Sequence, residues 1–144
     1  MLRLYTYFRS SAAFRVRIAL HLKGLAFEAV PVHLLRGGGE QHAASYRAKS
    51  PLGNVPTLED EVEGVHCTLT QSLAIIEYLE EVHPLPPLLP ADAMGRARVR
   101  ALAQTIACDI HPLNNLRVLQ YLKDVLGVDQ AARDRWYRHW VEQG

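Results

Sequence analysis

The sequence has little cysteine, and none of its histidines has the spacing of a metal site. Its two cysteines, Cys67 and Cys108, are far apart and form no CxxC pair. We therefore interpret both as reduced, buried residues rather than as a disulfide or a dithiol redox centre. The seven histidines show no HxxxH or HExxH spacing, so the sequence predicts no metal site. A formal net charge of +1 gives no reason to expect a nucleic-acid partner.

Long apolar segments are also missing. No apolar run approaches the roughly 20 residues of a membrane-spanning helix, so we expect no membrane partner. The first residues, MLRLYTYFRSS, alternate apolar and polar side chains and lack the apolar core of a signal peptide. The composition, 49 % hydrophobic and 22 % charged, is typical of a globular protein. We expect a cytoplasmic protein.

Residues 1–83 alternate between strand and helix patterns. The predicted elements are a strand at 2–8, a helix from Ser10 and Ser11 to Leu22, a strand at 27–32, a short helix at 40–48, strands at 57–59 and 66–69 joined by a turn at Glu63 and Gly64, and a helix that starts at 71 and 72 and ends at His83 and Pro84. The order β-α-β-α-β-β-α predicts an α/β domain with a thioredoxin-like fold.

The two longer helices of this domain each carry apolar residues at helical spacing. In the first helix these are Phe14, Ile18 and Leu22. In the second helix they are Leu73, Ile76, Leu79 and Val82. We expect both sets to face the core.

A proline-rich linker, residues 84–92, separates this domain from a helical second part, residues 93–144. Here the pattern predicts one long helix over 93–126, bent at Pro112, and another over 129–142 that carries Trp136 and Trp140. Two or three helices make a thin bundle, and the aromatic face of the last one has little to cover it. We expect an incomplete all-α domain, or one completed by a partner chain.

Three features of the first domain suggest chemistry, although each also has a plain structural explanation. Ser10 and Ser11 open a helix where redox members of this fold have cysteine; a serine hydroxyl there can donate to a bound thiolate, or merely cap the helix. Val55 precedes Pro56 and can offer its backbone to an extended peptide, or simply precede an ordinary trans proline. Gln71 and Ser72 begin a helix whose N-terminus can bind an anion, or Ser72 is only a cap.

Together the three features are more informative than any one of them. The fold order places the two helix N-termini and the proline loop at one edge of the sheet. A small acidic peptide with a thiol would find there a backbone partner, a carboxylate site and a hydroxyl. Glutathione is such a peptide, so we expect it as the cofactor.

The segments TYFRSSAAFRVRIALHLKG, NVPTL, LTQSLAIIEYLEE, LLPAD and IHPLNNLRVLQYL resemble zeta-class glutathione transferases over essentially the whole chain. This resemblance implies a two-domain fold, glutathione as cofactor, a homodimer, and cis–trans isomerisation of maleylacetoacetate or maleylpyruvate in aromatic catabolism. It also implies a longer chain than this one. Under the resemblance, Ser10 and Ser11 are the catalytic residues. The implied glutathione contacts are Ser10, Ser11, Gln41, Val55, Pro56, Gln71, Ser72, His111, Asn115, Leu116 and Arg117.

The substrate implied by the resemblance carries two carboxylates and needs cationic partners. Arg9, beside Ser10, is the best candidate, and Arg117 is the second. We expect Arg15 and Arg17 to make structural ion pairs or to face solvent, and we assign neither to the site. Two alternatives stay open: a glutathione transferase that conjugates substrates or dehalogenates α-halo acids, and a glutathione-binding fragment without catalysis.

Overall fold

The computed structural model describes residues 1–144, and the chain divides into the units Met1–Leu88 and Leu89–Gly144. Four strands form one sheet in the first unit, in the order β2-β1-β3-β4. These strands are β1 (Leu2–Thr6), β2 (Phe27–Pro31), β3 (Thr57–Val62) and β4 (Val65–Thr70). Strand β1 runs parallel to β2 and antiparallel to β3, so the predicted thioredoxin-like fold is confirmed.

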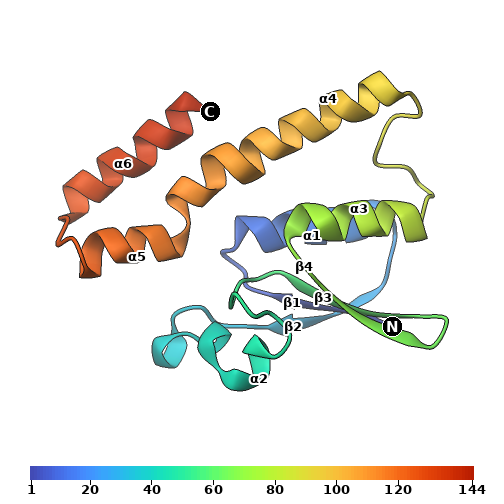
Figure 1. Ribbon diagram of the computed structural model, residues 1–144, viewed down its shortest axis with the longest axis horizontal. Helices are drawn as coiled ribbons and strands as arrows, with labels where there is room; N and C mark the ends of the chain where they lie inside the picture. The colour runs from blue at the N-terminus through green and yellow to red at the C-terminus, as the bar shows by residue number, and fades with distance from the viewer. The chain divides into compact units, whose positions relative to one another are not determined.

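Helices cover both faces of the sheet. Figure 1 shows α1 (Ser11–Leu22) and α3 (Ser72–Val82) on one face and the short α2 (Ala44–Arg47) on the other. The turn between β3 and β4 has positive φ at both predicted residues, 53° at Glu63 and 79° at Gly64. Two such residues make the kind of tight turn that matches the twist of a β-hairpin.

The alternation of side chains along β1 supplies two cores. One core lies between the sheet and the helices α1 and α3; its buried members are Leu2, Leu4, Val16, Leu20, Leu58, Ile75 and Leu79. The other lies on the α2 side of the sheet; its buried members are Tyr5, Tyr7, Val32, Tyr46 and Val55. The second core is mostly aromatic and lies under the loop that precedes β3.

The predicted buried face of α1 is wrong. Phe14 is 54 % exposed and Ile18 and Leu22 are exposed as well, whereas Val16 and Leu20 are fully buried. Both sets of residues have helical spacing. The sequence pattern therefore predicted a helix correctly but did not show which face of the helix is buried. The buried face of α1 also includes Ala13 and Ala19, whose small side chains let the helix approach the sheet closely. The face predicted from the sequence carries larger side chains and would have kept the helix farther from the sheet.

The face of α3 and the burial of the cysteines also differ in part from expectation. Leu79 is buried as predicted, but Ile75 takes the central place expected of Ile76. Cys67 is half-buried and Cys108 is exposed, so the expectation that both are buried is wrong. Both thiols are free.

A buried carboxylate on β3 connects the sheet to the segment after α2. Glu59 is 4 % exposed, accepts a hydrogen bond from the Tyr5 hydroxyl at 3.0 Å and pairs with Lys49 and Arg3. Burial by itself would raise the pKa of Glu59, but the hydrogen bonds from Lys49 and Tyr5 outweigh it and bring the pKa below its ordinary value of 4.5. The ionised form of Glu59 is therefore the stabilising one.

Glu59→Gln should make the first unit less stable at neutral pH by about 1–3 kcal/mol, because it removes a charge-assisted network. A depressed pKa stabilises the fold above pH 4.5, and this contribution is lost as the pH falls through the folded-state pKa. The variant should therefore lose less stability than the unmodified protein between neutral pH and pH ~3. Urea denaturation across this pH range measures both effects. Glu28→Gln is the matched control, because Glu28 pairs with the same Arg3 but is half-exposed; equal pH profiles for the two variants would contradict the prediction.

The proline-rich segment after α3 is fastened to the first unit by a buried ion pair. The Lys23 ammonium, at the end of α1, lies 2.6 Å from the Glu80 carboxylate on α3. It also donates to the carbonyls of His83 at 2.7 Å and Pro86 at 3.1 Å. The Glu80 carboxylate in turn accepts the Leu88 N–H at 3.0 Å. Residues 83–88 thus belong to the first unit through specific polar contacts.

The second unit is helical, but the single long helix predicted over 93–126 is wrong. The chain forms α4 (Ala93–Gln104), a π-helical turn at Thr105–Ile110, a 3-10 turn at His111–Asn114, and then α5 (Leu116–Asp124). Pro112 lacks an N–H and so removes one helical hydrogen bond, and Asn115 has an extended backbone and caps a new helix. The π-helical turn before Pro112 has no signal in the sequence that we identified.

The last helix, α6 (Gln130–Gln143), packs against α5 and the 3-10 turn. The Trp136 indole donates to the Leu113 carbonyl at 2.8 Å, and Trp136 stays half-buried. No residue between 89 and 144 is buried. None of the helices has the length and apolar character needed to cross a membrane.

Candidate functional site

The strand register brings the three predicted features of the first unit to one edge of the sheet. Continued by two residues, the pairing of β1 with β3 sets Val55 opposite Tyr7, three residues before Ser10. Strand β4 ends opposite the start of β3, and Ser72 opens the helix that follows. Helices α1 and α3 pack side by side, so their N-termini lie at this same edge.

Ser10 is the N-cap of α1. Its Oγ accepts the Ala13 N–H at 3.1 Å, and its own N–H donates to the Tyr7 carbonyl at 3.0 Å. A hydroxyl that accepts one hydrogen bond still has a proton to donate. Capping and donation to a ligand are therefore compatible. Ser11 is the first residue of the helix and is exposed.

The loop before β3 offers free backbone groups. The Val55–Pro56 peptide bond is cis, and neither the N–H nor the carbonyl of Val55 has a hydrogen-bond partner within the protein. Gln41 lies beside this loop, because its backbone carbonyl oxygen closely approaches Gly53. A Cβ atom built on Gly53 would lie only 2.9 Å from that oxygen. The side chain of Gln41 is buried, and its Oε1 has no partner either. Unsatisfied buried acceptors are uncommon, and this one suits a ligand donor.

The N-terminus of α3 is the one long-helix start in this chain that no side chain caps. The helices α1, α4, α5 and α6 are capped by Ser10, Asp92, Asn115 and Asp129 respectively. In α3 the N-cap position is taken by Gln71, which makes no side-chain cap bond. The backbone N–H groups of the first turn therefore remain available for an anion.

Arg15 lies beside the start of α3, a contact that the sequence analysis did not predict. Its Nη1 donates to Ser72 Oγ at 2.9 Å, so Ser72 retains its proton for a ligand and a guanidinium lies beside it. Ser72 thus does not act as the cap of α3, which was the alternative explanation for it. We expected structural ion pairs or solvent contact for Arg15, and the hydrogen bond to Ser72 adds a contact that we did not expect. The sequence held one indication of this contact: Arg15 lies one helical turn after Ser11, so both side chains lie on the same face of α1.

Gln71 adopts φ 70° and ψ 115°, a backbone conformation that disfavours side chains. Such strain costs about 1–3 kcal/mol and is found where a site requires it. Gln71→Gly should therefore raise the free energy of unfolding by about 1 kcal/mol, whereas Gln71→Ala should not. Because both variants lack the carboxamide, both should bind glutathione equally weakly. Urea denaturation and calorimetric titration separate the two effects; destabilisation by glycine would contradict the strain argument.

The remaining predicted residues lie beside Ser10 or in the second unit. Arg9 is exposed in the turn between β1 and α1 and forms no ion pair. His111, Asn115, Leu116 and Arg117 belong to the second unit and surround the break before α5, not a continuous helix as predicted. Asn115 caps α5 by accepting the Arg117 N–H at 3.1 Å, and its amide lies 3.4 Å from the His111 ring. Their assignment to the site stays a prediction.

Comparison with known proteins identifies the family. Residues 4–87 match the family model described as "Glutathione S-transferase, N-terminal domain". The chain belongs to the glutathione S-transferase family. A Vibrio cholerae protein named "Probable maleylacetoacetate isomerase" is 54 % identical over 141 residues, which cover 98 % of this chain and 64 % of the relative. The chain thus spans about two thirds of the length of the curated relatives it matches.

Solved structures of the family agree with this membership. A holo structure of "Maleyl Pyruvate Isomerase", described as a bacterial glutathione S-transferase in the zeta class, superposes with a TM-score of 0.88 at 47 % identity. The match covers 98 % of this chain and 64 % of that one. A maleylacetoacetate isomerase from Methylobacterium extorquens AM1, solved with bound malonate and GSH, has a TM-score of 0.87 at 44 % identity and covers 96 % of this chain and 62 % of that one. The resemblance to the zeta class is confirmed.

Proposed function

We propose that this chain belongs to a glutathione-dependent isomerase that converts maleylacetoacetate or maleylpyruvate to the fumaryl isomer. The observation that carries the proposal is the set of polar groups brought together at one sheet edge. These are the Ser10 hydroxyl, the free backbone of Val55, and the uncapped start of α3 with Ser72 and Arg15. Relatives that carry the names of these two isomerases support the choice of reaction.

Glutathione fits these groups by its chemistry. Its glutamyl carboxylate suits the α3 N-terminus, where the helix dipole, Ser72 and Arg15 all favour negative charge. Its cysteinyl backbone suits Val55 as an added extended strand. Gln41 offers an acceptor that lacks a donor in the protein. When bound, glutathione supplies the thiolate nucleophile whose reversible addition to the cis double bond permits rotation.

Ser10 holds the thiolate by donating its hydroxyl proton in a hydrogen bond. A thiol has an ordinary pKa near 8.5, so it is mostly protonated at neutral pH. Lowering that pKa by one requires about 1.4 kcal/mol. A hydrogen bond to a charged group contributes about 1.5–3 kcal/mol, so the Ser10 hydroxyl alone can account for a thiol pKa of about 6.3–7.4. The N-terminus of α1 adds to this in the same direction.

The second substrate carries carboxylates, for which we propose Arg9 and Arg117 as partners. Arg9 supports this role because it is next to Ser10 and no protein carboxylate neutralises it. A relative solved with malonate and GSH is consistent with a dicarboxylate beside glutathione. The conjugating transferase and the α-halo acid dehalogenase share the glutathione contacts and differ only in this second substrate.

The direct test is isomerisation of maleylpyruvate and maleylacetoacetate by this 144-residue chain, with and without glutathione. Glutathione-dependent turnover of either compound supports the isomerase. Preferential turnover of α-halo acids or aryl halides would favour the transferase instead. Glutathione binding with no turnover of any of these compounds would leave a binding fragment and remove the proposed activity from this chain.

Arg15→Lys should raise the KM for glutathione by about 10-fold or more while changing kcat little. Lysine keeps the charge but cannot reproduce the planar donor pair, and this contact acts on the carboxylate rather than on the thiol. Initial rates at varied glutathione concentration measure both constants. Arg36→Lys is the matched control, since Arg36 is exposed and pairs only with Glu40. An equal loss of kcat and kcat/KM in Arg15→Lys would contradict a role confined to the carboxylate.

We also propose a cytoplasmic homodimer. Two free cysteines suit a reducing compartment, and the helical second unit has no buried residue of its own, which favours a covering partner. Sedimentation of the protein across a concentration series tests the dimer.

A further inference from the structure

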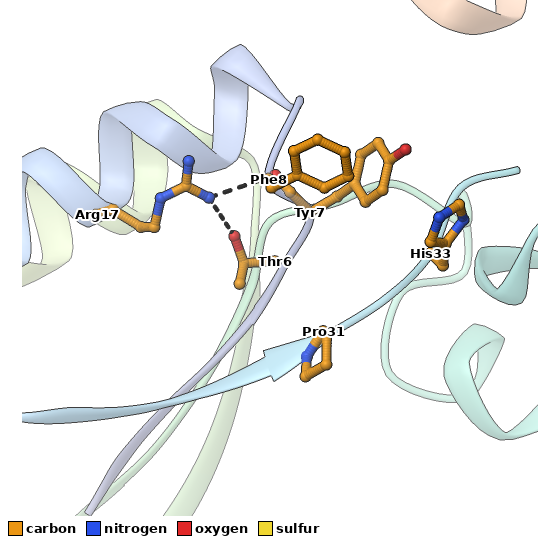
Figure 2. Close-up of a pocket in the computed structure, with 6 residues that line it drawn as sticks. All are labelled: Thr6, Tyr7, Phe8, Arg17, Pro31 and His33. Carbon is orange, nitrogen blue, oxygen red and sulfur yellow. Dashed lines mark hydrogen bonds between the residues drawn. The ribbon is translucent and has the colours of Figure 1, made fainter.

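A cavity of about 460 Å³ lies in the first unit beside, but outside, the proposed glutathione site. Figure 2 shows the residues that line it, which come from the end of β1, from α1 and from the end of β2: Thr6, Tyr7, Phe8, Arg17, Pro31 and His33. Its volume falls within the roughly 300–1,000 Å³ of small-molecule sites. None of the groups proposed to bind glutathione lines it.

The cavity has one uncompensated cation. Arg17 Nη1 donates to Thr6 Oγ1 at 2.7 Å and to the Tyr7 carbonyl at 3.3 Å, as the dashed lines in Figure 2 indicate. The Phe14 ring lies 5.3 Å from this guanidinium. No carboxylate pairs with Arg17, and its Nε and Nη2 make no hydrogen bond within the protein. A half-buried guanidinium without a counter-ion favours an anionic ligand.

The other walls are flat and mostly apolar. The Tyr7 ring contacts the Phe8 ring edge-on at 4.8 Å and the His33 ring at 5.1 Å. Pro31 closes the β2 side, and Phe8 is 73 % exposed although it is a large apolar side chain. Flat rings of this kind bind a planar apolar body through stacked or edge-on contacts. A sugar or a polyphosphate would find too few polar partners here.

Charge decides which end of the cavity takes the anion. His33 Nδ1 accepts the backbone N–H groups of Leu35 at 3.2 Å and Arg36 at 2.9 Å, so the neutral ring carries its proton on Nε2. The Glu40 carboxylate accepts the backbone N–H of His33 at 2.7 Å and is itself paired with Arg36 at 3.7 Å. Arg17 is the one arginine or lysine that lines the cavity, so a ligand carboxylate is favoured at Arg17, with the rest of the ligand toward Pro31 and His33.

We propose that this pocket binds a small aromatic carboxylate, whose acid group pairs with Arg17 and whose ring contacts Tyr7, Phe8 and Pro31. The site is separate from the glutathione site and does not depend on it. It goes beyond the proposed isomerase activity, which uses none of these side chains.

Titration of the whole chain with benzoate, followed by amide NMR, tests the proposal. Benzamide is the matched ligand, because it keeps the ring and the shape but lacks the charge. Benzoate should bind saturably and about 10-fold or more tightly than benzamide, with shifts at Thr6, Tyr7 and His33. Saturating glutathione should leave this binding unchanged. Equal binding of the two ligands, shifts confined to Ser10 and Ser72, displacement by glutathione, or no saturation would each overturn it.

Single substitutions test whether Arg17 is the residue that binds the benzoate carboxylate. Arg17→Gln should reduce benzoate affinity to that of benzamide, and Phe8→Ala should weaken both ligands alike. Arg36→Gln, which removes an exposed guanidinium nearby, should change neither. If Arg17→Gln unfolds because its contacts to Thr6 and Tyr7 are lost, the comparison of the two ligands on the unmodified chain still decides. Unchanged benzoate affinity in folded Arg17→Gln would overturn the proposal, whether or not glutathione binds elsewhere.

Discussion

Ser10→Ala should lower the glutathione-dependent isomerisation rate by about 10- to 150-fold near neutral pH, which corresponds to the roughly 1.5–3 kcal/mol of one charge-assisted hydrogen bond. The hydroxyl is expected to stabilise the thiolate of bound glutathione, so its loss returns the thiol pKa toward 8.5. The deficit should therefore shrink as the pH rises. The pH profile of kcat/KM and the ultraviolet absorbance of the bound thiolate measure this change independently.

Helix capping must be separated from catalysis, because Ser10 Oγ also accepts the Ala13 N–H. Losing the cap to alanine costs about 1 kcal/mol of stability, whereas glycine at an N-cap costs only a few tenths. Ser10→Gly should therefore fold nearly as stably as the unmodified chain and be as inactive as Ser10→Ala. Ser11→Ala, at the exposed first position of α1, should lose less activity than either. Full turnover in Ser10→Gly would mean that the hydroxyl serves only as a cap.

The fold of the first unit was accessible from sequence because its signals are local. Serines before an apolar repeat start α1, His83 and Pro84 end α3, and Glu63 with Gly64 makes the hairpin turn. Each follows from backbone chemistry that neighbouring residues decide. The convergence of Ser10, Val55 and Ser72 then follows from strand order, because helix starts and the strand edge meet on one side.

Which face of a helix is buried could not be decided locally. Phe14, Ile18 and Leu22 repeat as regularly along α1 as Val16 and Leu20 do, and the larger side chains made the wrong stripe more persuasive. The choice depends on how closely the helix can approach the sheet and α3, which is a tertiary property. The prediction of one continuous helix over 93–126 failed for a different reason. Pro112 was recognised as a bend, but Asn115 was not recognised as the N-cap of a new helix, α5.

Arg15 and Lys23 were missed for one physical reason. A charged side chain is expected at the surface unless it is paired, and pairing over a long sequence separation leaves no local pattern. Arg15 meets Ser72 across 57 residues, and Lys23 meets Glu80 across the same separation. Both contacts join α1 to α3, so only the packing of the two helices reveals them.

Lys23→Met should destabilise the first unit by about 3–5 kcal/mol, because it leaves the Glu80 carboxylate buried without its cation. The Lys23 side chain is fully buried and that of Glu80 is 9 % exposed, so water cannot compensate. All three ammonium protons have acceptors, from Glu80, His83 and Pro86. Both tryptophans lie in the second unit, so hydrogen exchange at the amides of β1 and β3 is the appropriate measurement. Lys123→Met, which removes an exposed lysine, should change stability by less than about 0.5 kcal/mol.

A double-mutant cycle separates pairing from packing. Glu80→Leu alone should also be costly, since it leaves the Lys23 ammonium with carbonyls but no counter-charge. The double variant Lys23→Met/Glu80→Leu should lose clearly less than the sum of the two single variants, because neither charge then remains buried. The Leu88 amide should exchange faster in every variant that lacks Glu80, since that carboxylate is its acceptor. Additive losses would mean that the two side chains contribute only as separate packing elements, and the linker would then be held by its prolines and not by the ion pair.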